Sequence, residues 1–387
     1  MSSKDSTNAG EKEPSALTGH TASARRIGQR DLASIFGVST MTISRALSGR
    51  GYVDKELRIQ IREAASRAGY RPHRAAQTLV RNQSITIVLV APVWPAFFWQ
   101  ELGLGVEVAH NQLEHLGYSV TYLMVDFSQS EKLTESIEEI IAARPHAVGI
   151  VNMQSCKMEK VFSNFERSGI PFLTFNIDAP TTARIGYIGP DYHQDGRIAA
   201  GFVDKCVRKE SSILIVAKDE PPTTFDGFSI DEARLRGIRE FLEDEAQNIR
   251  SFELFHVHVD PHQGALVAVA RNVVKAAAGH HAILVIPSEL QEPTGNELLG
   301  EADSRRPVLV TFGNSPRVIE LIRQGSVTAT LSLNPIQQGY YAVVLLATFL
   351  EKGAVPKPGV FYIGPNIVIK ENAGVSYDLF AQINSIF

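Results

Sequence analysis

The chain has 387 residues, 44% of them hydrophobic, so it is long enough for two or three domains and can bury a sizeable core. Its two cysteines, Cys156 and Cys206, lack metal-ligand spacing, and no apolar run reaches the roughly 18 residues that cross a bilayer, which argues against disulfide-rich, zinc-binding and membrane-spanning classes. The net charge of −4 hides an asymmetry, because residues 25–82 hold twelve Arg and Lys against four Asp and Glu. This basic segment suggests a polyanionic partner, with a merely solvated face as the alternative.

The amino-terminal residues 1–25 are rich in Ser, Thr, Gly, Ala and charge, and they lack the apolar segment of a signal peptide. We therefore expect a disordered tail and a cytoplasmic protein.

Residues 26–71 have a helical pattern that predicts three short helices. The first is ended by Gly37, Ser39 can cap the second, and Asp54 can cap the third, which we expect to stop at Gly69. The expected inward positions are Leu32, Ala33 and Phe36 in the first helix, Ile43, Ala46 and Leu47 in the second, and Leu57, Ile61, Ala64 and Ala68 in the third.

The second helix presents an unusual outward face of small hydroxyls, one methionine and one arginine. Helix, glycine-containing turn and helix form the helix-turn-helix pattern, whose second helix enters the major groove of DNA. Hydroxyl groups can donate to phosphates, and Arg45 can bind guanine O6 and N7. The alternative is an ordinary helical hairpin with a solvated arginine. The expected DNA-facing residues here are Ser39, Thr40, Met41, Thr42, Ser44 and Arg45.

From residue 84 onward, short apolar runs such as ITIVLVAP, HAVGIV, SILIVA and AILVIP alternate with amphipathic segments. This alternation predicts parallel sheets covered by helices on both faces. Two series, divided near 184–191, predict two doubly wound α/β lobes within 84–387. A ligand would bind in the cleft between the lobes, at the carboxyl ends of the strands.

Several motifs together resemble the lactose-repressor (LacI/GalR) family of bacterial transcription regulators. They run from RDLASIFGVSTMTISRALSG through GYRPHRAAQTL, and weaker matches follow in GRIAAGF, RLRGIREFL and TATLSLNPIQQGYYAV. The resemblance implies a helix-turn-helix head, a hinge helix with its linker at 72–83, and a periplasmic-binding-protein-like domain that binds an effector and forms a homodimer.

The segment RPHRAAQTL places Pro72 at a helix start and the apolar Ala76 and Leu79 three residues apart. About nine residues are too few for a stable free helix. The resemblance implies that this hinge helix folds on the operator, with Leu79 as a minor-groove wedge and Ala76 beside it. His73 and Arg74 are counted with them as DNA-binding residues. A linker helix packed on the body is the alternative.

For the effector, the aromatic residues Phe97 and Phe98 follow the first strand and can stack on a sugar, although core packing explains them equally well. Arg234 matches the family arginine that contacts effector, with an exposed arginine at a helix start as the alternative. Asn176 and Asn314 are the other expected contacts. Departures from the family pattern stand at Asn176, Gly313, Pro287-Ser288 and Leu333. They suggest a ligand less hydroxylated or more anionic than a neutral sugar.

An enzyme is disfavoured, because the sequence has no P-loop, GxSxG motif, Cys/His nucleophile arrangement or metal constellation, and we expect no cofactor and no metal. His256 and His258 fit the exposed face of a strand better than a ligand pair. A transport-type solute receptor would explain 84–387 but not the basic helices. The sequence therefore predicts a ligand-responsive regulator, most simply a repressor of a carbohydrate operon, that binds an operator as a dimer; an activator or a corepressor-dependent regulator remains the alternative.

Overall fold

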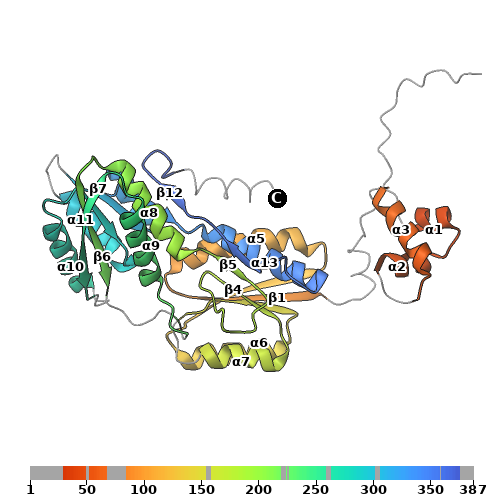
Figure 1. Cartoon of the computed structure of the whole chain (residues 1–387). Coiled ribbons are helices and arrows are strands. Elements are labelled where there is room, and N and C mark those ends of the chain that lie inside the picture. Colours follow the sequence, from red (N-terminus) through yellow and green to blue (C-terminus); the bar gives the residue numbers. More distant parts are fainter. Residues whose placement is uncertain are drawn as a thin grey trace, which may run out of the picture. The chain divides into compact units, whose positions relative to one another are not determined.

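The computed structural model of the chain describes residues 29–48, 52–67, 84–153, 158–218, 224, 226–258, 263–300, 306–357 and 359–374 (Figure 1). They fall into two compact units, one within Met1–Ala76 and the other within Gln77–Phe387. The predicted tail at 1–25 and the predicted hinge helix and linker at 72–83 lie outside these ranges and remain predictions. No helix in the described ranges has the length and apolar character to cross a membrane.

The first unit consists of three helices, α1 (Gln29–Phe36), α2 (Thr40–Ser48) and α3 (Lys55–Arg67). They enclose a small hydrophobic core, and most of its buried residues are ones that the sequence predicts to face inward. The buried residues are Leu32, Ala33, Ile43, Ala46, Val53, Ile61 and Ala65, of which Val53 and Ala65 were not predicted. The prediction of Ala64 as an inward residue is wrong by one position, because Ala65 lies one full turn after Ile61 on the buried face and Ala64 is only half-buried.

Both predicted caps of this unit are present. The Ser39 hydroxyl accepts a hydrogen bond from the Thr42 backbone N–H at 3.0 Å, and the Asp54 carboxylate accepts from the backbone of Glu56 and Leu57, each at 3.0 Å. Gly37, at φ +63°, takes the left-handed conformation that the turn between α1 and α2 requires. The predicted turn between α1 and α2 is thus formed by a glycine that tolerates a positive φ and by a serine that caps the following helix.

The second unit begins with lobe 1, a parallel sheet of six strands in the order β11-β5-β4-β3-β1-β2. Its elements are β1 (Ile85–Pro92), α5 (Ala96–Glu114), β2 (Tyr118–Val125), α6 (Ser130–Ala143), β3 (Ala147–Ile150), α7 (Met158–Ser168), β4 (Phe172–Phe175), β5 (Tyr187–Gly189), α13 (Pro335–Lys352) and β11 (Val360–Tyr362). Buried strands β3 and β4 are covered on both faces, as expected from their unbroken apolar runs.

Lobe 2 is a second six-stranded sheet, in the order β12-β10-β9-β8-β6-β7. Its elements are α8 (Tyr192–Cys206), β6 (Ser211–Lys218), α9 (Ile230–Asp244), β7 (Ile249–Val257), α10 (Gln263–Ala276), β8 (Ala282–Val285), α11 (Ser288–Gly300), β9 (Val308–Phe312), α12 (Pro316–Gln324), β10 (Ala329–Ser332) and β12 (Asn366–Val368). The expectation of fully parallel sheets needs one correction, because the edge strand β12 pairs with β10 in the antiparallel direction.

The chain passes between the lobes more often than the sequence predicts. The passage between β5 and α8 lies within the predicted division at 184–191. The chain then returns to lobe 1 for α13 and β11, and crosses again to lobe 2 for β12. In lobe 1, α5 and α13 cover one face of the sheet and α6 and α7 cover the other, as Figure 1 shows.

The lobes contact each other at the carboxyl ends of their strands. The Asn314 side chain, directly after β9 of lobe 2, donates a hydrogen bond to Glu101 on α5 of lobe 1 at 3.3 Å. Ala233 of α9 belongs to the hydrophobic core of lobe 1. The fold therefore brings the strand ends of both sheets to one place, where α/β proteins bind ligands.

Candidate functional site

The outward face of α2 is the first candidate site. Ser39, Thr40, Met41 and Arg45 are exposed, and the Met41 side chain keeps 60% of its surface in contact with solvent. Single exposed apolar side chains are common on protein surfaces, so Met41 alone does not identify a binding site. Together with the neighbouring hydroxyl groups and Arg45, it makes this face of α2 a candidate contact surface.

Two other predicted residues of that face, Thr42 and Ser44, are half-buried and so less exposed than the first four. One of them already has a hydrogen-bond partner within the unit. The Thr42 hydroxyl shares a hydrogen bond of 2.9 Å with the Ser39 hydroxyl. The other end of α2 is fixed by Arg62 of α3, whose Nε donates to the Ala46 carbonyl at 3.1 Å. The structure thus brings the six predicted residues of α2 together on one rigid helix. The predicted hinge residues His73, Arg74, Ala76 and Leu79 lie outside the described residues.

The second candidate site lies where the two lobes meet, and Asn152 is at its centre. Asn152 follows β3 and is fully buried. Its Nδ2 donates to the Asp178 carbonyl at 2.7 Å and to the Asp226 carboxylate at 3.3 Å. Its Oδ1 is buried without a hydrogen-bond partner among the described residues. A buried acceptor without a partner is costly, so it is a candidate ligand contact.

Asn176, a predicted effector residue, is held tightly from several sides. Its backbone adopts φ +63°, and the Tyr187 hydroxyl donates to its carbonyl at 2.8 Å. Its Nδ2 donates to Gln338 of α13 at 3.1 Å, and its Oδ1 accepts from the Tyr192 hydroxyl at 3.3 Å. Burial raises the pKa of Tyr192, which keeps this hydroxyl protonated as a donor. These bonds leave one amide hydrogen of Asn176 for a ligand.

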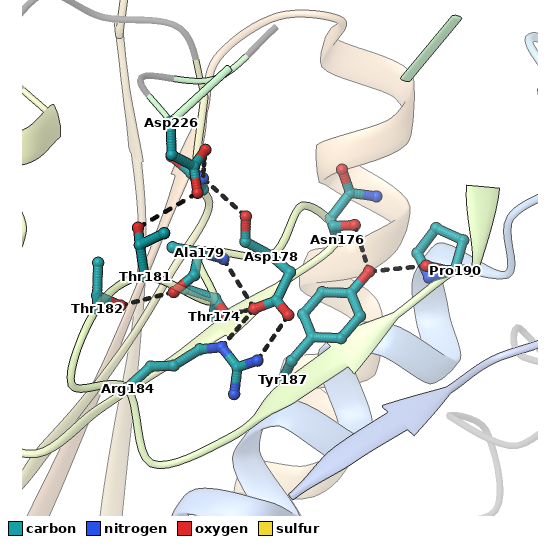
Figure 2. A network of polar contacts seen from close by, with 11 residues as sticks. Thr174, Asn176, Asp178, Ala179, Thr181, Thr182, Arg184, Tyr187, Pro190 and Asp226 are labelled. Carbon is teal, nitrogen blue, oxygen red and sulfur yellow. Dashed lines mark hydrogen bonds and ion pairs between the residues drawn. The ribbon is translucent and has the colours of Figure 1, made fainter. Parts of the chain in front are cut away.

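Asp178 forms a compact ionic cluster beside Asn152, which Figure 2 shows from close by. Its carboxylate lies 2.5 Å from Arg184 Nε and 2.7 Å from Arg184 Nη2, a two-pronged ion pair. The Thr174 hydroxyl and the Ala179 backbone N–H donate to the same carboxylate at 2.8 and 2.7 Å. Asp178 lies two residues after the predicted effector residue Asn176, and in the structure its charge is already compensated.

Arg234, the predicted arginine of lobe 2, is buried at the start of α9. Its guanidinium lies over the ring of Phe312 at 4.3 Å and near the ring of Tyr192 at 5.3 Å. Asp231 is 4.0 Å away, at the limit of an ion pair, and Arg234 Nε has no hydrogen-bond partner among the described residues. The alternative of an exposed arginine at a helix start is wrong, because Arg234 is 95% buried by its neighbours.

Asp195 is a buried carboxyl group beside this arginine. It is 1% exposed, and its Oδ2 has no hydrogen-bond partner among the described residues. Burial raises its pKa to about 7, the Arg234 charge opposes this rise, and Asp191 adds to it. Lobe 2 therefore places the Arg234 guanidinium next to the Asp195 carboxyl group, and each has an atom that can still form a hydrogen bond.

The aromatic residues after β1 divide between core and surface. Phe98 belongs to the lobe 1 core, where its ring meets Trp99 edge-on at 4.8 Å. Phe97 is half-buried against the same core, and Trp94 is 76% exposed. Core packing thus accounts for Phe98 and Trp99, while Phe97 remains the better candidate for stacking on a ligand.

Asn314, the last predicted effector residue, is buried at the end of β9 and donates to Glu101 across the lobes. Sequence reasoning missed Asn152, Asp195, Asp226 and Tyr192. Asn152 had a recognisable signal, since a polar residue follows the apolar run HAVGIV directly. Asp226 had none, because its contacts with lobe 1 are to residues more than forty positions earlier in the chain.

The comparisons with known proteins agree with this two-part architecture. Residues 87–354 match the family described as periplasmic binding protein domain, and residues 30–73 match the bacterial regulatory proteins of the lacI family. The first match covers most of lobes 1 and 2, from within β1 to the end of α13, and leaves out β11 and β12; the second covers α1 from Arg30 onward, α2 and α3.

Two curated relatives illustrate the likeness. The HTH-type transcriptional regulator AglR of Rhizobium meliloti (strain 1021) is 42% identical over 67 residues, 17% of this chain and 19% of that protein. The ribose operon repressor of Bacillus subtilis (strain 168) is 28% identical over 162 residues, 41% of this chain and 47% of that protein. The chain thus matches about half or less of the length of these two relatives.

Solved structures share the fold of the second unit. The sugar-binding protein of a sugar ABC transporter from Bacillus halodurans superposes with a TM-score of 0.65 at 18% identity, covering 76% of this chain and 100% of that one. The arabinose-binding protein AraP from Geobacillus stearothermophilus gives 0.64 at 19% identity, covering 77% and 99%. Because the family model matches residues 87–354, more than half of the chain, the chain belongs to the periplasmic binding protein domain family, and its residues 30–73 match the bacterial regulatory proteins of the lacI family.

Proposed function

We propose that the protein is a ligand-responsive, sequence-specific DNA-binding transcription regulator that represses a carbohydrate or related catabolic operon. In this proposal a homodimer binds a palindromic operator in the cytoplasm, each α2 enters a major groove, and the hinge helices around Leu79 occupy the minor groove between them. No membrane partner is involved.

The observation that carries this proposal is the exposed face of α2. Hydroxyl groups at its start, Met41 and Arg45 stand outward on a helix whose inner face is locked by Ile43 and by the bond from Arg62. A short rigid helix with such a face fits the major groove, and the basic character of residues 25–82 supports attraction to phosphates. The printed names of relatives, ribose and sucrose operon repressors among them, support the same assignment.

The effector end of the proposal rests on the unused hydrogen-bonding atoms between the lobes. Arg234 Nε offers a donor, and Asn152 Oδ1 offers an acceptor, both buried. A hydroxyl group can satisfy either one, so a polyhydroxylated ligand such as a sugar or a sugar derivative fits both. The half-buried Phe97 supplies an apolar surface for a sugar face. Whether the ligand is more anionic than a neutral sugar is decided by a thermal-shift screen with neutral and acidic sugars.

Selection of genomic fragments by the purified protein tests the proposal, with Arg45→Ala as the informative variant. We expect wild type to enrich a pseudo-palindromic site, and the variant to lose about 1–3 kcal/mol of discrimination at one base pair in each half-site. Arg67→Ala is the matched control, because Arg67 is an exposed arginine on α3 of the same unit. It should leave base preference unchanged. Unaltered preference in Arg45→Ala would remove its role as a base reader.

A further inference from the structure

We propose that Asp226 of lobe 2 is a positioning residue for the candidate effector site, because its carboxylate orients the Asn152 amide of lobe 1 and fastens the two lobes at this point. The inference deepens the proposed function and rests on it for any consequence at the operator. Its structural part, a contact between the lobes that fixes one side chain, stands on hydrogen bonds of the described residues alone.

The orientation of the Asn152 amide is set by two acceptors. One amide hydrogen goes to the Asp178 carbonyl of lobe 1 and the other to Asp226 Oδ1 of lobe 2. If the amide rotated by half a turn, its oxygen would face these two acceptors and both bonds would be lost. Asn152 Oδ1 therefore points elsewhere as an acceptor, and it is the atom left without a partner.

Asp226 is itself presented by a tight turn between β6 and α9. The Thr224 hydroxyl donates to Asp226 Oδ1 at 2.5 Å and accepts from the Phe228 backbone N–H at 2.9 Å. The Phe228 ring packs against the ring of Tyr192 on α8, with centroids 6.0 Å apart. Because these contacts lie within lobe 2, they restrain Asp226 independently of lobe 1 and lower the entropic cost of its contact with Asn152.

A second contact joins Asp226 to another segment of lobe 1. The Thr181 hydroxyl donates to Asp226 Oδ2 at 3.4 Å, as the dashed line in Figure 2 shows. The nearby Asp178 carboxylate is paired with Arg184, so its repulsion of a second carboxylate is reduced. The Asp226 carboxylate of lobe 2 thus contacts two segments of lobe 1, the end of β3 through Asn152 and the loop after β4 through Thr181.

The arrangement couples ligand binding to the position of the lobes. Asn152 keeps both of its fixing acceptors only while Asp226 lies against it. Separation of the lobes would leave the bond to the Asp178 carbonyl but remove the bond to Asp226, so the orientation of the amide, and with it the ligand acceptor at Oδ1, is held most firmly when the lobes are together. A ligand that uses this atom would therefore favour the closed arrangement by its differential binding.

Hydrogen–deuterium exchange of the full-length protein without ligand, read by mass spectrometry, tests this inference. In Asp226→Asn we expect exchange to rise roughly tenfold in lobe 1 peptides covering 147–153 and 172–182, as for loss of a charge-assisted hydrogen bond. Thr181→Val, which removes only the 3.4 Å contact, should raise exchange in 172–182 by about threefold. Asp126→Asn is the matched control, because the bonds of Asp126 go to Ser128 and Gln129 in its own turn of lobe 1.

A rise confined to 224–230 would overturn the inference, since Asp226 would then stabilise only its own turn. Unchanged exchange in lobe 1 for both variants would overturn it as well. Thermal denaturation establishes that each variant is folded, and if Asp226→Asn does not fold, Thr181→Val decides by the same criterion. Genomic selection with wild type separates the two proposals, because a protein without DNA preference would contradict the proposed function and leave the exchange result in force.

Discussion

Asp195 and Arg234 are neighbouring buried ionisable side chains of lobe 2 whose hydrogen bonding is incomplete within the described structure. Each has a polar atom without a hydrogen-bond partner there, and Arg234 is further held between the rings of Phe312 and Tyr192. Removing ionisable and polar groups from water is costly unless hydrogen bonds satisfy them. A ligand that supplies those bonds would recover this cost, which gives a physical reason for placing the effector here.

The raised pKa of Asp195 predicts a pH dependence of stability. Its pKa of about 7 in the folded protein exceeds the ordinary aspartate value of 3.8, so between about pH 4 and 7 the carboxyl group is protonated in the folded protein and ionised in the unfolded chain. The free energy of unfolding therefore falls as pH rises through this window, by about 4 kcal/mol at most. Asp195→Asn removes this loss, so its melting temperature relative to wild type should rise between pH 5 and pH 8.

Differential scanning calorimetry at several pH values measures this difference. Asp244→Asn, at an exposed position on α9, is the control and should show a nearly constant offset from wild type. If the offset of Asp195→Asn is equally constant from pH 5 to pH 8, the carboxyl group is not held protonated by its surroundings.

At the scale of elements, each lobe contains one pair of helices that touch backbone to backbone at glycines. In lobe 1, a Cβ on Gly105 of α5 would lie 1.9 Å from the Ile336 carbonyl oxygen, and one on Gly339 of α13 would lie 2.1 Å from the Leu102 carbonyl oxygen. In lobe 2, Gly196 of α8 and Gly237 of α9 approach each other's helices in the same way. These close approaches set the positions of the strand ends that form the candidate site.

Gly339→Ala tests the close packing of α5 against α13. The added methyl group would overlap backbone that cannot move without separating the helices, so we expect a clear loss of melting temperature, corresponding to about 1–3 kcal/mol or more. Gly201→Ala on α8 is the matched control, because its Cβ would lie 3.3 Å from the Phe241 ring, which can shift slightly. Alanine also favours helix by about 1 kcal/mol over glycine, so the control should be neutral or stabilising. Equal melting temperatures for both variants would contradict the backbone contact.

The sequence predicts local structure far better than contacts between distant segments. Apolar periodicity and caps such as Ser39 and Asp54 predict the helices of the first unit, because these signals act within a few residues. The return of α13 to lobe 1 and the antiparallel edge strand β12 escape prediction, since they depend on packing between elements that are distant in sequence, more than two hundred residues for α5 and α13 and more than thirty for β10 and β12. The same holds for the candidate site, where Arg234 and Asn176 were predicted but Asp226 was not.

The whole molecule combines a helix-turn-helix unit with a two-lobed unit, and contacts between the lobes position the candidate ligand-binding atoms. In the proposed regulator, a ligand acts on DNA only through its different affinity for two arrangements of the lobes. The coupling between two such sites is reciprocal and is typically about 5- to 150-fold in affinity. Both the sign and the size of this coupling can be measured on the intact protein.

The most direct test is fluorescence anisotropy of full-length protein on its selected genomic site, with and without a sugar that raises its melting temperature. The account predicts that the sugar changes the Kd for that site by roughly tenfold or more, and changes the Kd for random DNA much less. The account would be contradicted if the Kd for the selected site stayed the same at saturating sugar, or if no genomic fragment were bound in preference to random DNA.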